Sequence, residues 1–437
     1  MSSVEPRQPE QGSGTKTFDQ PDDQAAELVT TTDASAELLA DSLGDYVRIM
    51  LRRIRSGESG ALPVIVGLIV IVIFFQARNS LFLSAGNLVN LIDQSAFIIT
   101  LGMAEIFVLL LGDIDLAAGY TAACGAVIAL WMLALGDPLW AAVLAALGGS
   151  AAYGALQGII IAKLRLPSFV VTLAGQLFLS GLLLYLISAT GNIGVGGVIN
   201  LHNSIINDIE SGYLSPTATW IVLIAIAVVA GVVLFYSDFR RRSAGLVAPP
   251  LSVTLLKIAA VFAAAVIVAA IANQNRGRLI VLEGLPWGVL VVLAILFVWT
   301  VLLGRTRFGR YLYAIGGNAE AARRAGISIV RIRTLAFTLC GLTAGMTGII
   351  YASYLGSIST GVDGGQNVLY AVAAAVIGGT SLFGGRGKML HAVLGGLVVG
   401  VIYNGLELLG LSAAAQLMWT ALVLLAAVIV DRITRRG

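Results

Sequence analysis

Charged and amide side chains inside long apolar segments are the residues of this sequence that could do chemistry. They are Asn90, Asp93, Glu105, Asp113, Asp115, Asn404 and Glu407. Such groups are costly in hydrocarbon and therefore indicate function. None has an obvious Lys, Arg or His at helical spacing, and the two histidines, His202 and His391, lie elsewhere. The sequence therefore predicts no metal site, cofactor or catalytic residue.

The composition is that of a membrane protein. Of the 437 residues, 58% are hydrophobic and 12% charged, and the mean hydropathy is +0.91. Charged residues normally make up about a quarter of a globular chain, so a soluble enzyme and a nucleic-acid-binding protein are both excluded. Cys124 and Cys340 lie in segments rich in Ala and Gly, which is typical of small packing residues rather than a disulfide.

The polar residues must be positioned by membrane-spanning helices, each of which needs about 20 mostly apolar residues. The candidate spans are 62–78, 87–111, 116–136, 138–163, 167–188, 216–236, 251–272, 284–303, 334–353, 367–381, 389–410 and 416–431. Segment 367–381 is short and bounded by Gly, which favours a broken or re-entrant segment. We expect an all-α polytopic protein with 10 to 12 transmembrane helices.

The basic residues predict how the chain is oriented. Residues 1–57 form a polar, acidic tail that ends in a basic juxtamembrane segment, and 58–437 form the transmembrane domain. The tail reads as disordered, and it lacks the pattern of a secretory signal, so the first apolar run is expected to stay in the membrane. The Arg and Lys clusters alternate with the spans so that both termini are predicted to be cytoplasmic.

The loop 304–333 is the longest polar interruption in the apolar part of the chain. Asn318 is a good N-cap, the residues from Glu320 to Ala325 are strong helix formers, and Gly326 is a good C-cap. One helix of about two turns is expected there. So short a helix is marginal in water, which favours a cytoplasmic protein partner. An ordinary basic cytoplasmic loop with a chance helix is the alternative.

Two glycine-rich segments, 315–320 and 378–390, could suggest a phosphate-binding loop. A Walker-type loop needs Ser or Thr directly after its Gly-Lys pair, and here Met389 follows Lys388. If transport is driven by ATP, the ATPase must therefore be another chain.

Several spaced motifs resemble one family of ABC importer permeases, which serves ribose, xylose and related sugars and, more distantly, branched-chain amino acids. Glu320-Ala321-Ala322 with Gly326 looks like the coupling loop of such permeases, and the agreement extends over about residues 60 to 436. The further motifs are GDIDLAAG (112–119), LPSFVVTLAGQLFLSG (166–181), GGTSLFGGRGKMLHAVLGGLVVGVIYNGLELLG (378–410) and LLAAVIVDRITRR (424–436). The additional span at 251–272 is most similar to the xylose-type branch. Asp113, where Gly is common, and Glu105 inside the second span depart from the family pattern.

The resemblance implies a non-enzymatic permease of the bacterial inner membrane. Its expected partners are a second permease copy, in a homodimer or a heterodimer, two cytoplasmic ATP-binding subunits and an extracytoplasmic sugar-binding protein. The residues expected to couple to the ATPase are Gly317, Asn318, Glu320, Ala321, Ala322, Arg323, Arg324 and Gly326. Asp113, Asp115 and Asn404 are interpreted as lining the translocation pathway, or alternatively as capping broken helices.

Three functional hypotheses remain open on the sequence. The first is the permease subunit of an ATP-driven importer of a pentose such as xylose, or of a related monosaccharide. The second is a branched-chain amino acid ABC permease. The third, an ion-coupled secondary transporter, would need paired intramembrane ionisable groups, and a membrane-embedded enzyme is disfavoured because no site emerges.

Overall fold

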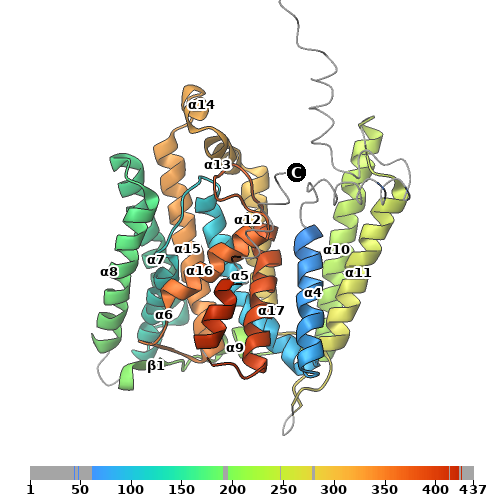
Figure 1. Ribbon diagram of the computed structural model, residues 1–437, viewed down its shortest axis with the longest axis horizontal. Coiled ribbons are helices and arrows are strands. Elements are labelled where there is room, and N and C mark those ends of the chain that lie inside the picture. Colours follow the sequence, from blue (N-terminus) through green and yellow to red (C-terminus); the bar gives the residue numbers. More distant parts are fainter. Residues whose placement is uncertain are drawn as a thin grey trace, which may run out of the picture.

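The computed structural model is a bundle of helices, and it describes residues 62–189, 195–246, 248–277, 281–412 and 414–422, together with Gly44, Arg48 and Leu425. Its longer helices run between a face that carries α14 and an opposite face that carries β1 (Figure 1). The helices are α4 (Leu62–Arg78), α5 (Ala85–Leu109), α6 (Ala118–Ala134), α7 (Leu139–Leu164), α8 (Ser168–Ala189), α9 (Ser204–Ser211), α10 (Pro216–Ser243), α11 (Leu251–Ala272), α12 (Trp287–Arg305), α13 (Arg307–Gly317), α14 (Ala319–Arg324), α15 (Ile329–Leu355), α16 (Gly364–Ile377) and α17 (Met389–Leu408).

The observed helices match the predicted spans from 62–78 to 389–410 closely, and the all-α polytopic fold is confirmed. The last predicted span, 416–431, lies largely outside the described residues. Within the described ranges, eight helices are long and apolar enough to cross a membrane, and α4, α6 and α16 are shorter apolar helices. The segment predicted at 367–381 is α16, which has 14 residues. At 1.5 Å per residue it reaches about 21 Å, less than the roughly 30 Å of a bilayer core. Most of the tail 1–57 and the chain end after Leu425 lie outside the described residues.

The core of the bundle is built around α5. The most apolar window of α5 is 94% buried, whereas the corresponding windows of α10 and α11 are 22% and 11% buried. Figure 1 shows α5 inside the bundle, with α8 at one edge and the α10–α11 pair at the other. The outer helices keep large apolar side chains exposed, such as Phe178 on α8 and Val229 on α10, as lipid-facing surfaces do. The additional span α11 is therefore peripheral.

Small residues let α7 and α15 approach backbone to backbone. A Cβ added at Gly154 on α7 would overlap the main-chain carbonyl oxygen of Phe337 on α15. A Cβ added at Gly341 on α15 would likewise overlap the carbonyl oxygen of Ser150 on α7. Lipid provides no hydrophobic drive for helix association, so this close contact is what holds the two helices together.

A short β-ribbon closes the face opposite α14, and the sequence did not predict it. β1 (Val198–Asn200) pairs antiparallel with β2 (Ser357–Ser359), and Ile199 lies opposite Ile358. Both isoleucines are fully buried. The ribbon ties the segment after α8 to the α15–α16 connection.

The α7–α15 contact predicts a large effect of a single methyl group. Gly154→Ala should lower the free energy of unfolding by about 1–3 kcal/mol, because the obstructing atoms belong to the backbone and the helices must separate. The measurement is the thermal unfolding midpoint of the purified protein in one detergent.

Gly148→Ala on the same helix is the control, since nothing lies within 4 Å of the added Cβ. It should be neutral or slightly stabilising because Ala favours helix. Equal midpoints for the two variants would contradict the close packing.

Candidate functional site

The segment between α12 and α15 forms two consecutive short helices at one end of the bundle. The first, α13, begins after Thr306, whose hydroxyl accepts a hydrogen bond from the Gly309 amide at 3.3 Å. Its buried side chains, Leu312 and Ile315, face the bundle. The sequence analysis missed α13. Its signals were the Thr306 cap and the apolar spacing of Phe308, Leu312 and Ile315, which repeats once per helical turn.

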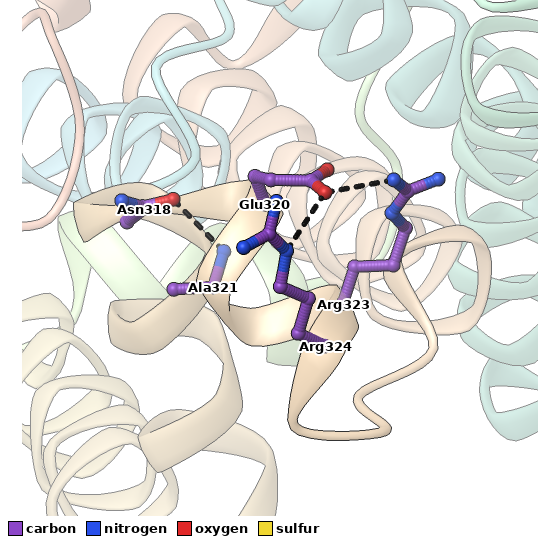
Figure 2. A network of polar contacts seen from close by, with 5 residues as sticks. All are labelled: Asn318, Glu320, Ala321, Arg323 and Arg324. Atoms are coloured by element: carbon purple, nitrogen blue, oxygen red, sulfur yellow. Dashed lines mark hydrogen bonds and ion pairs between the residues drawn. The ribbon is translucent and has the colours of Figure 1, made fainter.

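The second helix, α14, follows the sequence prediction. Asn318 caps it, with its side-chain oxygen accepting a hydrogen bond from the Ala321 amide at 2.9 Å. Gly326 just beyond the helix has a φ of +80°, the left-handed conformation that favours glycine. Figure 2 shows both arginines of the helix, Arg323 and Arg324, converging on Glu320 at 2.8 and 3.2 Å.

Almost every predicted coupling residue is exposed. Gly317, Asn318, Glu320, Ala321, Arg323, Arg324 and Gly326 are exposed, whereas Ala322 is buried in the main core. The hydrogen bond from Arg323 lowers the pKa of Glu320, so this carboxylate is ionised at neutral pH. Ala322 thus anchors one face of α14 in the core. The other faces present acidic and basic side chains to a partner surface.

Gly316 in α13 and the glycine-rich loop 378–388 both contact the backbone just after α5. A Cβ at Gly316 would overlap the carbonyl oxygen of Leu110, and the amide of Gly385 donates to that same oxygen at 2.9 Å. The Tyr313 hydroxyl donates to the carbonyl of Gly387 at 2.7 Å. The loop 378–388 is therefore a packing element between α13 and the end of α5.

Asp113 forms an ion pair that sequence spacing could not reveal. Its two carboxylate oxygens accept from Nε and Nη2 of Arg333 at 2.6 and 2.8 Å, a bidentate geometry. The Asp113 side chain is 5% exposed and that of Arg333 28%. Arg333 lies in the first turns of α15, close after α14, so the pair ties the α14 connection to the segment between α5 and α6.

Asp115 acts as a local cap near the start of α6. Its Oδ1 accepts a hydrogen bond from the Ala117 amide at 3.0 Å, and its Oδ2 lies 3.6 Å from the Cys340 thiol. Glu105 lies beside it, with Oε2 at 3.5 Å from the Asp115 amide. These contacts fit the capping alternative, in which the carboxylate satisfies backbone amides freed where the chain between α5 and α6 is not helical.

Asn404 lies near the opposite end of the bundle, so the structure does not bring the three predicted pathway residues together. Asn404 is 2% exposed. Its side chain accepts from Asn87 at 2.8 Å and donates to Gln94 at 3.0 Å. Gln94 in turn donates to Glu407 at 2.8 Å. The sequence analysis named Asn404 and Glu407 but missed both of their amide partners on α5.

Another pair of buried carboxylates, Asp93 on α5 and Glu210 on α9, lies near the face that carries β1. The two carboxyl groups interact with each other, and Oδ1 of Asp93 and both Glu210 oxygens are shielded from solvent. Sequence analysis named Asp93 and missed Glu210. Among the described residues, no three His, Cys, Asp or Glu side chains are grouped so as to hold a metal ion.

Comparison with known proteins gives one consistent result. The family described as branched-chain amino acid transport system / permease component matches residues 87–430. The chain is 33% identical to the xylose transport system permease protein XylH of Escherichia coli over 376 residues, 85% of this chain and 92% of XylH. It is 29% identical to the ribose import permease protein RbsC of the same species over 368 residues, 84% of this chain and 92% of RbsC.

The D-allose transport system permease protein AlsC, also from E. coli, is 29% identical over 366 residues, 84% of this chain and 89% of AlsC. No solved structure matches significantly. With eight helices of spanning length in the part of the chain that the structure describes, this is a multi-pass protein of the inner membrane. It belongs to the branched-chain amino acid transport system permease family.

Proposed function

We propose that this chain is the membrane-spanning permease subunit of an ATP-driven importer of a pentose such as xylose or of a related monosaccharide. The observation that carries the proposal is helix α14, which is exposed, bears charged side chains and is anchored by Ala322. It lies in a chain whose alignment covers 92% of the length of XylH. In this assignment the face that carries α14 is cytoplasmic and the face that carries β1 is extracytoplasmic.

The proposed assembly divides the work among several chains. ATP hydrolysis belongs to a cytoplasmic ATP-binding subunit, present in two copies, that docks on Asn318 to Gly326. A second permease copy completes the path, and an extracytoplasmic sugar-binding protein delivers the substrate. Because α14 is exposed on nearly all sides and has only six residues, a partner surface is the reason for it to stay ordered.

A branched-chain amino acid is the second candidate substrate, and the printed description of the matching family favours it. XylH, RbsC and AlsC, each named for a sugar, favour the monosaccharide. Uptake assays with D-xylose, D-ribose and L-leucine in the presence of the cognate binding protein separate the two. Uptake that survives ATP depletion but stops when the proton gradient collapses would instead favour an ion-coupled transporter.

Reversing the charge of Glu320 tests the coupling role. Glu320→Arg should lower ATP-dependent uptake about tenfold, a change of about 1.4 kcal/mol, because it places three positive charges together on the docking surface. The measurement is sugar uptake and ATPase activity of the complex purified from native membranes.

Asp137→Arg provides the matched control, because Asp137 is exposed in the α6–α7 turn away from α14. It should retain uptake. If Glu320→Arg also transports at the native rate with the same amount of protein in the membrane, α14 is not the coupling element.

The Asp113–Arg333 pair predicts a non-additive effect on stability. Asp113→Asn and Arg333→Gln should each destabilise the protein, because each leaves one charge without its partner. The double variant should lose less than the sum of the single losses by about 1–3 kcal/mol.

The checks are unfolding midpoints of the three variants, with Asp137→Asn as the control for loss of an exposed carboxylate. Additive losses would mean that the two side chains do not stabilise each other. Sugar uptake by the same variants then shows whether the Asp113–Arg333 ion pair between the α14 connection and the segment before α6 is needed for transport.

A further inference from the structure

Hydrogen bonds link four side chains in a series, from Asn87 through Asn404 and Gln94 to Glu407. The donor and the acceptor of each bond in this amide chain are fixed. Asn87 donates one amide N–H to the Phe82 carbonyl at 2.8 Å and another to Asn404. With Asn87 fixed as a donor, Asn404 must donate to Gln94, and Gln94 must donate to Glu407. The amide chain therefore ends on a carboxylate, which can only accept further hydrogen bonds.

The carboxylate at the end of this chain is held in place and yet accessible. Gln94 and Asn404 are 1% and 2% exposed, whereas Glu407 is exposed near the end of α17. Gln94 occupies Oε2 of Glu407, which leaves Oε1 open. A carboxylate on the surface of a spanning helix is costly against lipid, so we expect it to face water or polar groups.

Two tyrosine side chains lie near the carboxylate. Tyr403 lies one turn before Glu407 on α17, and Tyr354, near the end of α15, lies beside Gln94 and within electrostatic range of Glu407. The rings of Tyr403 and Tyr370 meet edge to face with their centroids 6.2 Å apart. Tyr354 and Tyr403 are both partly exposed. Two phenol groups and one oriented carboxylate thus share one surface.

This surface has the chemistry that a neutral sugar requires. Sugar hydroxyls donate hydrogen bonds to a carboxylate and exchange them with phenol groups, while the C–H faces of a sugar ring pack on aromatic rings. A small cavity lined by Tyr351 and Asn367 holds about 10 Å³, which is room for one water molecule, so this cavity is not where a sugar would sit.

We propose that Tyr354, Tyr403 and Glu407 form a contact surface for the sugar on its way through the permease. Asn404 and Gln94 are positioning residues, which touch no sugar themselves and hold the Glu407 carboxylate through the amide chain. The proposal rests on the function proposed above and adds to it a place where the permease itself touches its substrate.

The test is thiol labelling of the full complex in proteoliposomes, using a membrane-impermeant reagent added from the side of the binding protein. Cys124 and Cys340 are 5% and 0% exposed and contribute little background. The probe variant is Tyr403→Cys, and the control is Phe178→Cys on the outer helix α8, where the native side chain is 64% exposed. Uptake of D-xylose, D-ribose and D-allose by the native complex is measured first.

Tyr403→Cys is expected to react about tenfold faster than Phe178→Cys, because a water-filled path admits the charged reagent and lipid does not. Excess transported sugar should slow the reaction at least about threefold, while L-leucine should not. Reaction as slow as that of Phe178→Cys, or fast reaction that no transported sugar slows, overturns the contact surface. Absence of sugar uptake by the native complex would instead contradict the proposed function.

The positioning role of Asn404 has a separate readout. In the variant Tyr403→Cys/Asn404→Leu, reagent access without sugar should match that of Tyr403→Cys, and protection by sugar should be lost. Glu407→Gln should lower the maximal uptake rate about tenfold without changing the half-saturating sugar concentration, which the binding protein sets. Full protection in the double variant, or native uptake by Glu407→Gln, overturns the corresponding role.

Discussion

Direct contact between helix backbones is the constraint on which this structure depends. Lipid cannot drive apolar helices together as water does, so packing needs surfaces that fit at short range. Gly154 and Gly341 provide that fit between α7 and α15, and Gly316 provides it between α13 and the end of α5. Each of these positions abuts a main-chain carbonyl oxygen and has no room for a side chain. The helices in these contacts can therefore move only together or by breaking the contact.

Hydropathy was sufficient to predict the spanning helices because each span must be a long apolar segment whatever its neighbours are. The α14 helix was predictable for another local reason, since Asn318 and Gly326 mark its ends in the sequence. The adjacent α13 was missed because three glycines and two arginines obscure an apolar stripe of only three residues. The β-ribbon was missed because two three-residue strands carry too little pattern to reveal their pairing.

The spacing of residues in the sequence could not predict which polar side chains contact each other. Asp113 and Arg333 are 220 residues apart, and Gln94 and Asn404 are 310 residues apart. A search for interaction partners within one helix therefore finds neither of these two contacts. The sequence did place Asp113, Asp115 and Asn404 among the residues that need a special environment, because polar groups in apolar spans are costly. It could not reveal that Asp115 satisfies a local backbone amide, whereas Asp113 and Asn404 link segments that are far apart in the sequence.

Helix α15 connects the proposed coupling helix α14 with the proposed sugar-contact surface. It begins at Ile329, close after α14, carries Arg333 in its first turns, and ends at Leu355, directly after Tyr354. Between these points Gly341, Gly345 and Gly348 press it against α6 and α7 without room for side chains. A helix held in this way moves as one piece. In the proposed function, a displacement imposed on α14 by an ATP-binding subunit would be passed along α15 to Tyr354. Tyr354 and Glu407 lie on different helices, α15 and α17, so such a shift would change the distance between the phenol and the carboxylate, and a sugar that touches both would lose one of its contacts.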